Sequence, residues 1–281
     1  MLARVLTAVV GIPAAVVLIF YPGGLPFAVA VGVVAAVGAL EFYSGVRRSG
    51  ARPMAWAGLL ASIGFVVAAR MSDRPGTGLV LSGGLALLLA LCFLTEMVRR
   101  GRSPVVNVGA TVLGAVYVGW LLSHLVRLRA VAGEFAVGSV SAEAGAWLVM
   151  LAFACTWACD TSAFFIGRSY GKTKLAPSLS PRKTIEGSTA GFVGSMLMAM
   201  VFGAAVLDIP AGHALALGAI FGVLCQFGDL AESAIKREMG VKDLGAVMPG
   251  HGGVLDRFDS ILFAGPAAYY YAVFVMRAWP G

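Results

Sequence analysis

The sequence predicts an all-α, polytopic integral membrane protein with about nine transmembrane helices. Of its 281 residues, 59% are hydrophobic and only 12% are charged, whereas soluble domains carry roughly 25% charged residues. The mean hydropathy is +0.88, and the 37 glycines suit helices that pack closely in a bilayer. These observations exclude an ordinary soluble enzyme, a disordered chain and a secreted disulfide scaffold.

The spans are predicted from apolar segments of about 20 residues, the length that crosses a bilayer. No charged residue occurs between Val5 and Leu40, and Tyr21-Pro22-Gly23-Gly24 divides this run into two segments. The first segment lacks a following cleavage site, which favours an uncleaved span. The boundary at 207–209 is the least marked. The nine predicted segments are 5–20, 25–40, 53–69, 76–95, 104–126, 144–166, 187–207, 209–228 and 258–276.

The basic residues predict the orientation of these spans. With nine spans, loops on the side of the N-terminus carry 16 Lys and Arg residues, and the other side carries five. By the positive-inside rule, the N-terminus and the loops 167–186 and 229–257 face the cytoplasm. We expect the net charge of +7 to set topology and meet anionic lipid head groups, without any nucleic-acid partner.

The lysines are confined to these two loops, whereas arginines occur throughout the chain. Lysine provides a compact, flexible point charge that suits phosphate groups. Topology signalling alone is the alternative explanation. The five lysines are Lys172, Lys174, Lys183, Lys236 and Lys242.

The first polar motif runs from Asp160 to Gly187. Asp160 lies within an apolar segment, where a carboxylate is costly and is expected to face a cavity, a cation or a basic partner. A structural ion pair with a loop residue is the alternative. Downstream, Ser180-Pro181-Arg182-Lys183-Thr184 offers hydroxyls, amides and cations to a phosphate. The intervening Gly167–Thr173 resembles a P-loop, but its spacing is one residue short and no strand precedes it.

The second polar motif begins on a predicted helix. Its spacing places two acids, a hydroxyl and two cations on one helical face. An amphipathic helix in contact with water is the alternative explanation. The five residues of this face are Asp229, Glu232, Ser233, Lys236 and Arg237.

The same motif ends at the last span, where Asp256 and Asp259 share a helical face. An acid at this position can be a simple helix cap. Together with Asp229, however, the two carboxylates provide the hard oxygen ligands that Mg²⁺ prefers. His251-Gly252-Gly253, just upstream, offers an imidazole and exposed amides or, alternatively, a tight turn. The residues therefore indicate a cytoplasmic site that transfers a group between a nucleotide and a lipid phosphate.

The two motifs resemble those of a known family, the phosphatidate cytidylyltransferases (CDP-diacylglycerol synthases). The resemblance rests on Ser233-Ala-Ile-Lys236-Arg237, Lys242-Asp243 and the run from Pro249 to Asp259, and on the first motif. Met248 and Arg182 are mild departures from its pattern. The resemblance covers roughly residues 160–260. It implies conversion of CTP and phosphatidic acid to CDP-diacylglycerol and pyrophosphate, at the inner membrane of a bacterial cell, by a homodimer.

Roles for individual residues follow from this resemblance together with their chemistry. Asp229, Asp256 and Asp259 are expected to bind Mg²⁺, with Asp160 as a further acid and K⁺ as a possible second cation. The catalytic group comprises these first three acids with Lys236 and Arg237. The substrate-binding group comprises Ser180, Lys183, Thr184, Ser233, Lys242, His251, Gly252, Gly253 and Arg257.

The two halves of the chain are expected to differ in role. Residues 1–143 are predicted to form a scaffold of membrane helices, and residues 144–281 the catalytic region that carries both motifs. Two other functions remain open at this point. A CTP-dependent lipid kinase of the same superfamily would release CDP, and a secondary transporter would carry buried charges in both halves.

Overall fold

The computed structural model describes residues 2–72, 74–99, 103–245 and 252–276. The chain divides into two compact units, and helices α1 (Leu2–Phe20), α6 (Leu121–Arg129), α9 (Ala211–Glu238) and α10 (Leu255–Tyr271) contribute residues to both. Unit 1 comprises Met1–Ala14, Leu25–Arg127 and Ile235–Phe258. Unit 2 comprises Ala15–Gly24, Leu128–Ala234 and Asp259–Gly281.

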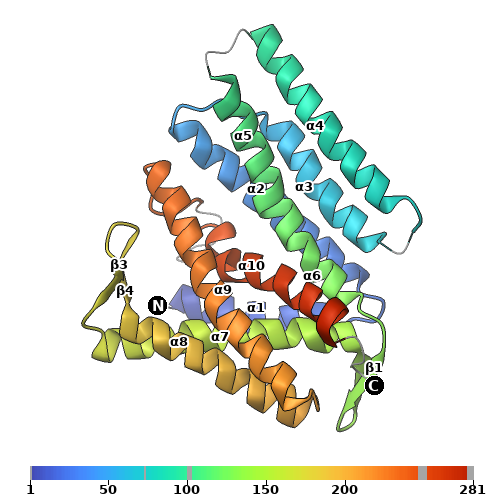
Figure 1. The fold of residues 1–281 in the computed structure, drawn as a ribbon, viewed down its shortest axis with the longest axis vertical. Helices are drawn as coiled ribbons and strands as arrows, with labels where there is room; N and C mark the ends of the chain where they lie inside the picture. Colours follow the sequence, from blue (N-terminus) through green and yellow to red (C-terminus); the bar gives the residue numbers. More distant parts are fainter. Residues whose placement is uncertain (1, 73, 100–102, 246–251, 277–281) are drawn as a thin grey trace. The chain divides into compact units, whose positions relative to one another are not determined.

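Unit 1 consists mainly of N-terminal helices that lie side by side (Figure 1). These are α2 (Leu25–Arg48), α3 (Ala55–Arg70), α4 (Thr77–Arg99) and α5 (Pro104–Gly114), the last continued by the π-helix η1 (Ala115–Trp120) and by α6 (Leu121–Arg129). Their packing centres on the buried Tyr43, whose hydroxyl donates a hydrogen bond of 2.7 Å to the Thr111 carbonyl oxygen. Gly114 lacks a side chain where α5 meets this ring, and a Cβ there would lie 2.6 Å from it.

Unit 2 contains the helices of the C-terminal half and two antiparallel hairpins (Figure 1). The helices are α7 (Ala144–Tyr170), α8 (Ile185–Met198), the π-helices η2 (Ala199–Val206) and η3 (Ala272–Met276), and the larger parts of α9 and α10. The hairpins pair β1 (Glu134–Val137) with β2 (Val140–Glu143), and β3 (Lys174–Ala176) with β4 (Ser180–Thr184).

Glycines allow α7 and α8 to approach each other closely in unit 2. A Cβ on Gly187 would lie 2.8 Å from the Ala163 carbonyl oxygen, and one on Gly191 would lie 3.0 Å from that of Cys159. Small residues at such contacts let membrane helices gain dispersion energy from backbone to backbone. This packing fixes the start of α8, which follows directly on β4.

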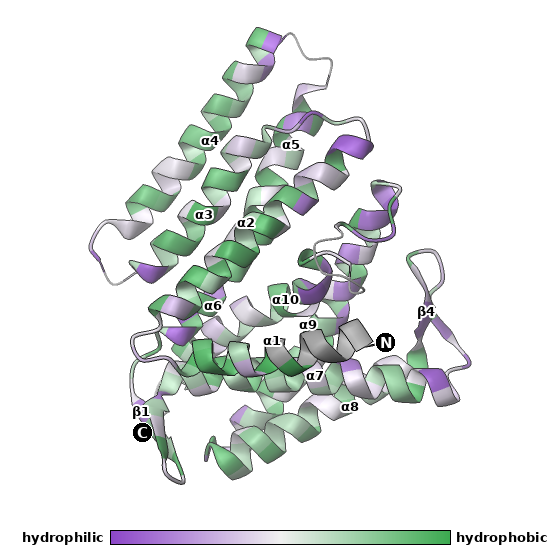
Figure 2. Cartoon of the chain, turned by 180° about the vertical axis from the view of Figure 1, so that it is seen from behind, coloured by the Kyte–Doolittle hydropathy of each residue, from purple (hydrophilic) through white to green (hydrophobic). Residues whose placement is uncertain are grey.

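The structure confirms the prediction of a polytopic all-α membrane protein. Among the described residues, seven helices could cross a membrane by length and composition, and the segments Gly11–Phe20 and Ala55–Arg70 are shorter apolar helices. Figure 2 shows hydrophobic residues along most of the helices and hydrophilic residues at helix ends and along β4. The seven long helices are Leu25–Arg48, Thr77–Arg99, Pro104–Arg129, Ala144–Tyr170, Ile185–Val206, Ala211–Glu238 and Leu255–Met276.

The helices extend further than the apolar segments that predicted them. α9 continues to Glu238, so the first ten residues of the predicted loop 229–257 are helical, and α2 continues past Leu40 to Arg48. Backbone hydrogen bonding continues a helix through polar residues, so hydropathy marks the end of a span and not the end of a helix. The boundary at 207–209 lies where predicted, because Asp208 adopts a φ of 53° between η2 and α9. The division of roles between 1–143 and 144–281 stays a prediction.

Candidate active site

In unit 2, an ion pair brings the two predicted motifs together. Lys183 on β4 places its Nζ 2.6 Å from Oδ2 of Asp229 on α9. The hydroxyl of Ser233, one turn further along α9, lies 3.5 Å from the other oxygen of Asp229. The side chains of Lys183 and Asp229 are 23% and 36% exposed, so both are accessible from outside the protein.

The position of Lys183 is set by the hairpin and by the start of α8. Thr184 is the N-cap of α8, and its hydroxyl accepts a hydrogen bond of 3.2 Å from Gly187 N. In the first turn of α8, the Glu186 carboxylate accepts hydrogen bonds from Lys172 N and Thr173 N, each at 3.1 Å. An acid at this end of a helix also complements the helix dipole. The hairpin is thereby fixed where β3 begins and where β4 ends.

Asp259 lies where α10 meets α9 in the same unit. A Cβ on Gly228 would collide with the Asp259 carbonyl oxygen, so the two backbones touch next to Asp229. The Asp259 carboxylate accepts a hydrogen bond of 2.6 Å from Ser260 N. Unit 2 therefore holds two of the predicted metal-binding acids on adjoining helices.

In unit 1, Asp256 is held more tightly. Its Oδ1 lies 2.8 Å from Lys236 Nζ, and its Oδ2 accepts hydrogen bonds from Gly253 N at 2.8 Å and Leu244 N at 3.2 Å. The side chains of Lys236 and Asp256 are 15% and 4% exposed. Each carboxylate oxygen of Asp256 thus has a protein donor.

The two ion pairs combine the same kinds of predicted residue. Each joins an acid predicted to bind metal with a lysine predicted to bind phosphate. Each lysine neutralises the charge of its acid, and this matters most for the buried Asp256, because a buried charge is tolerable only when paired. The Lys236–Asp256 pair is enclosed and the Lys183–Asp229 pair is accessible.

The remaining predicted residues are placed as follows. Asp160 lies on an exposed side of α7, and Ser180 is half-buried on β4. Arg237, Lys242 and Arg257 are exposed. Gly252 adopts a φ of +85°, a conformation that favours glycine. His251 lies outside the described residues.

The acids present fit a magnesium ion whose remaining ligands come from substrate phosphates and water. Among the described residues, no three His, Cys, Asp or Glu side chains gather as a ready-made metal site. Mg²⁺ is usually held by one or two carboxylates together with substrate phosphates and water. Asp229, which is 36% exposed, and Asp259 meet that requirement, whereas a cation at Asp256 would have to take the place of Lys236.

Glu41, which was not among the predicted site residues, contacts the second motif within unit 1. This residue is 6% exposed on α2, and its carboxylate accepts hydrogen bonds from Val254 N and Leu255 N. It falls outside the predicted spans because the apolar segment 25–40 ends at Leu40. An acid next to a charge-free segment of 36 residues was the available signal.

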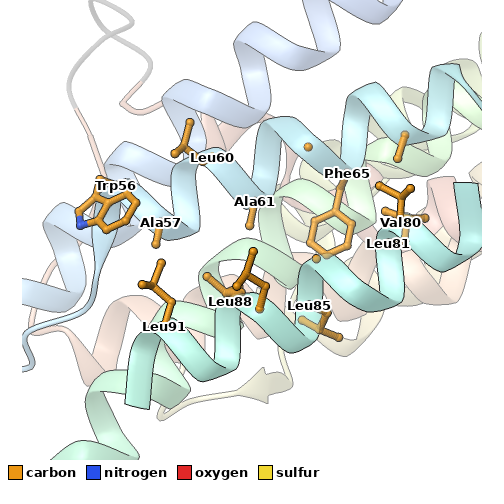
Figure 3. Close-up of a pocket in the computed structure, with 14 residues that line it drawn as sticks. Trp56, Ala57, Leu60, Ala61, Phe65, Val80, Leu81, Leu85, Leu88 and Leu91 are labelled. Atoms are coloured by element: carbon orange, nitrogen blue, oxygen red, sulfur yellow. The ribbon is translucent and has the colours of Figure 1, made fainter. Parts of the chain in front are cut away.

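The groove between α3 and α4 carries no comparable chemistry (Figure 3). It has a volume of about 320 Å³ and is lined by apolar and glycine residues, among them Trp56, Phe65 and Leu88. It offers no side-chain charge to a phosphate. In each unit the lysine–aspartate pair is therefore the better candidate for a part in the reaction.

Comparison with known proteins bears on the family of the chain. The model of the cytidylyltransferase family matches residues 2–275, which include both motifs and nearly all of the chain. The chain belongs to the cytidylyltransferase family. The resemblance seen in the sequence is thereby confirmed.

Individual relatives named phosphatidate cytidylyltransferase match over most of their length. A phosphatidate cytidylyltransferase of Synechocystis sp. is 34% identical over 293 residues, covering 97% of each chain. One of Bacillus subtilis is 33% identical, covering 95% of this chain and 96% of the relative. The chloroplastic phosphatidate cytidylyltransferase 4 of Arabidopsis thaliana is 32% identical and covers 92% of this chain and 70% of the relative.

Proposed function

We propose that this protein is an enzyme that transfers the cytidylyl group of CTP to phosphatidic acid, giving CDP-diacylglycerol and pyrophosphate. The observation that carries the proposal is the match, over 95% or more of the chain, to proteins named phosphatidate cytidylyltransferase. The lysine–aspartate pairs in both motifs add the charges that such a reaction needs. The product is a precursor for phospholipid synthesis.

The reaction joins two polyanions, so its main requirements are neutralisation and positioning. A phosphate oxygen of phosphatidic acid attacks the α-phosphorus of CTP. A new P–O bond forms there, the bond to the β-phosphate bridging oxygen breaks, and pyrophosphate leaves with that electron pair. No covalent intermediate with the protein is required.

The chain's own residues supply the cations for this reaction. We assign Lys183 and Lys236 to the phosphates of the two substrates, which they reach by exchanging their aspartate partners for phosphate oxygens. Arg237, Lys242 and Arg257 are exposed and extend this positive field. Ser180, Thr184 and Ser233 orient phosphate oxygens, and we assign a phosphate contact to the segment His251-Gly252-Gly253 as well.

The proposed cofactor is Mg²⁺, with K⁺ as a second cation. The proposed ligands are Asp229, Asp256 and Asp259, with Asp160 as a further acid. When bound, Mg²⁺ supplies charge neutralisation at the CTP phosphates. Release of Lys183 or Lys236 to a phosphate leaves a carboxylate ready to meet that cation, so substrate and metal binding are expected to reinforce each other.

The proposal extends to location and assembly. The positive-inside rule places both motifs on the cytoplasmic face of a bacterial inner membrane, where CTP is available and phosphatidic acid lies in the bilayer. We also propose a homodimer, on the basis of the family resemblance. Crosslinking of the protein in native membranes tests the assembly, and a single unlinked band would contradict it.

Two other functions are less well supported. A CTP-dependent lipid kinase would transfer the γ-phosphate and release CDP. A secondary transporter would turn over no CTP. Membership of the cytidylyltransferase family and the names of the full-length relatives disfavour both.

The experiment is a reconstituted assay with purified protein, CTP, phosphatidic acid and Mg²⁺. The expected result is CDP-diacylglycerol and pyrophosphate in equal amounts, with no lipid product when diacylglycerol replaces phosphatidic acid. Asp256→Asn, purified in parallel, controls for a contaminating activity. Lack of product from the folded wild type under these conditions would overturn the proposal.

A further inference from the structure

A buried acid in the N-terminal half holds the turn that carries the second motif. Glu41, on α2, is 6% exposed. Its Oε1 accepts a hydrogen bond of 3.0 Å from Val254 N, and its Oε2 accepts one of 2.9 Å from Leu255 N. These amides lie at the start of α10, where no helical carbonyl oxygen is available to them. Glu41, which precedes Val254 by 213 positions, therefore caps α10.

The fit around this carboxylate depends on glycines of the second motif. A Cβ on Gly253 would lie 2.6 Å from Glu41 Oε2, and one on Gly245 would collide with Oε1. The Glu41 carboxylate fits there because Gly245 and Gly253 have no side chains. Such enclosure leaves the carboxylate little freedom to move away from the two amides.

Asp256 belongs to the same hydrogen-bonded turn. Its Oδ2 accepts from Gly253 N at 2.8 Å, while Glu41 takes the next two amides along the chain. Three consecutive backbone amides are therefore shared between two carboxylates. The other oxygen of Asp256 holds Lys236 at 2.8 Å. The orientation of this ion pair depends on the turn that Glu41 fixes.

We propose that Glu41 is a positioning residue for the reaction, acting through the turn 253–255 on Asp256 and Lys236. This inference rests on the proposed function of the same site. It gives the N-terminal half a role in the reaction beyond that of a scaffold. The Glu41 carboxylate is occupied by the amides of Val254 and Leu255, so it acts through the turn that precedes Asp256.

The test compares Glu41→Gln with a matched buried acid of unit 1, Glu96. Glu96 on α4 is 5% exposed and is hydrogen-bonded by the Asn107 side chain at 2.8 Å, remote in sequence from both motifs. A glutamine at 41 keeps the size of the side chain but presents an N–H to one of the two amides. We expect Glu41→Gln to lower kcat at least tenfold with KM changed less than threefold, and Glu96→Gln to keep kcat within twofold.

Amide hydrogen exchange separates this proposal from the proposed function, because it needs no turnover. We expect exchange at Val254 and Leu255 to accelerate at least tenfold in Glu41→Gln and to stay unchanged in Glu96→Gln. Glu41→Asp, which keeps the charge on a shorter side chain, should fold and show intermediate values of both readouts. Wild-type exchange at these amides, or equal kcat losses in the Glu41→Gln and Glu96→Gln variants, would overturn the positioning role. An inactive wild type with slow exchange at these amides would overturn the function instead.

Discussion

Substitution of Asp256 by Asn removes the charge from the better enclosed of the two ion pairs. Asn keeps an oxygen for the amides of Leu244 and Gly253, so the main loss is the contact with Lys236 at 2.8 Å. Removing one partner of a buried pair costs about 3–5 kcal/mol. Lys236 retains 15% exposure and can turn toward water, so we expect about 3 kcal/mol. The same change at Asp229, which is 36% exposed, should cost less than about 1 kcal/mol.

Unfolding in mixed micelles, followed by tryptophan fluorescence, measures both free energies against the wild type. A loss of about 3 kcal/mol leaves most proteins folded, because native stabilities are about 5–15 kcal/mol. Both variants should remain folded and lose turnover at least a hundredfold. Equal stability losses in the two variants would refute the reasoning from burial. Near-normal turnover in both would refute their assignment to the reaction centre.

Four further predictions concern the two motifs and the metal requirement. Lys183→Met should raise the KM for CTP or for phosphatidic acid at least tenfold. Lys174→Met, at an exposed lysine of β3, should change both KM values less than twofold. Equal effects of the two variants in steady-state assays would contradict the assignment of Lys183 to a substrate phosphate. Thr184→Ala should lower the free energy of unfolding by about 1 kcal/mol through loss of the α8 N-cap, and Thr184→Ser should retain it; no difference between them in the same micelle titration would contradict the cap. Gly253→Ala should lower kcat at least tenfold because its Cβ meets Glu41, whereas Gly212→Ala has open space; a normal kcat for the first would contradict the fit. EDTA should stop turnover and Mg²⁺ restore it, and turnover that persists in EDTA would contradict the metal requirement.

Hydropathy predicted the spans because the energy of burying a helix in a bilayer depends on composition over about 20 residues. It could not predict where the helices end. The end of α9 at Glu238 and that of α2 at Arg48 depend on backbone hydrogen bonds and on packing. The short hairpin of β3 and β4 was missed for a similar reason, since its bounds depend on contacts with Glu186 and Thr184.

The motifs indicated the candidate residues, but not their partners. Lys183 and Asp229 are 46 positions apart, and their ion pair follows from the tertiary packing of unit 2. Asp256 was expected to bind metal, and the structure adds that Lys236 and two amides already hold it. Glu41 could not be linked to the second motif from spacing alone, because 213 residues separate it from Val254.

The most direct test of the proposed reaction follows the label from two forms of CTP in parallel reactions with phosphatidic acid and Mg²⁺. Cytidylyl transfer predicts that label at the α-phosphate enters the lipid product and that label at the γ-phosphate leaves in pyrophosphate. Label from the γ-phosphate in the lipid, with α-label released in CDP, would contradict the proposed reaction.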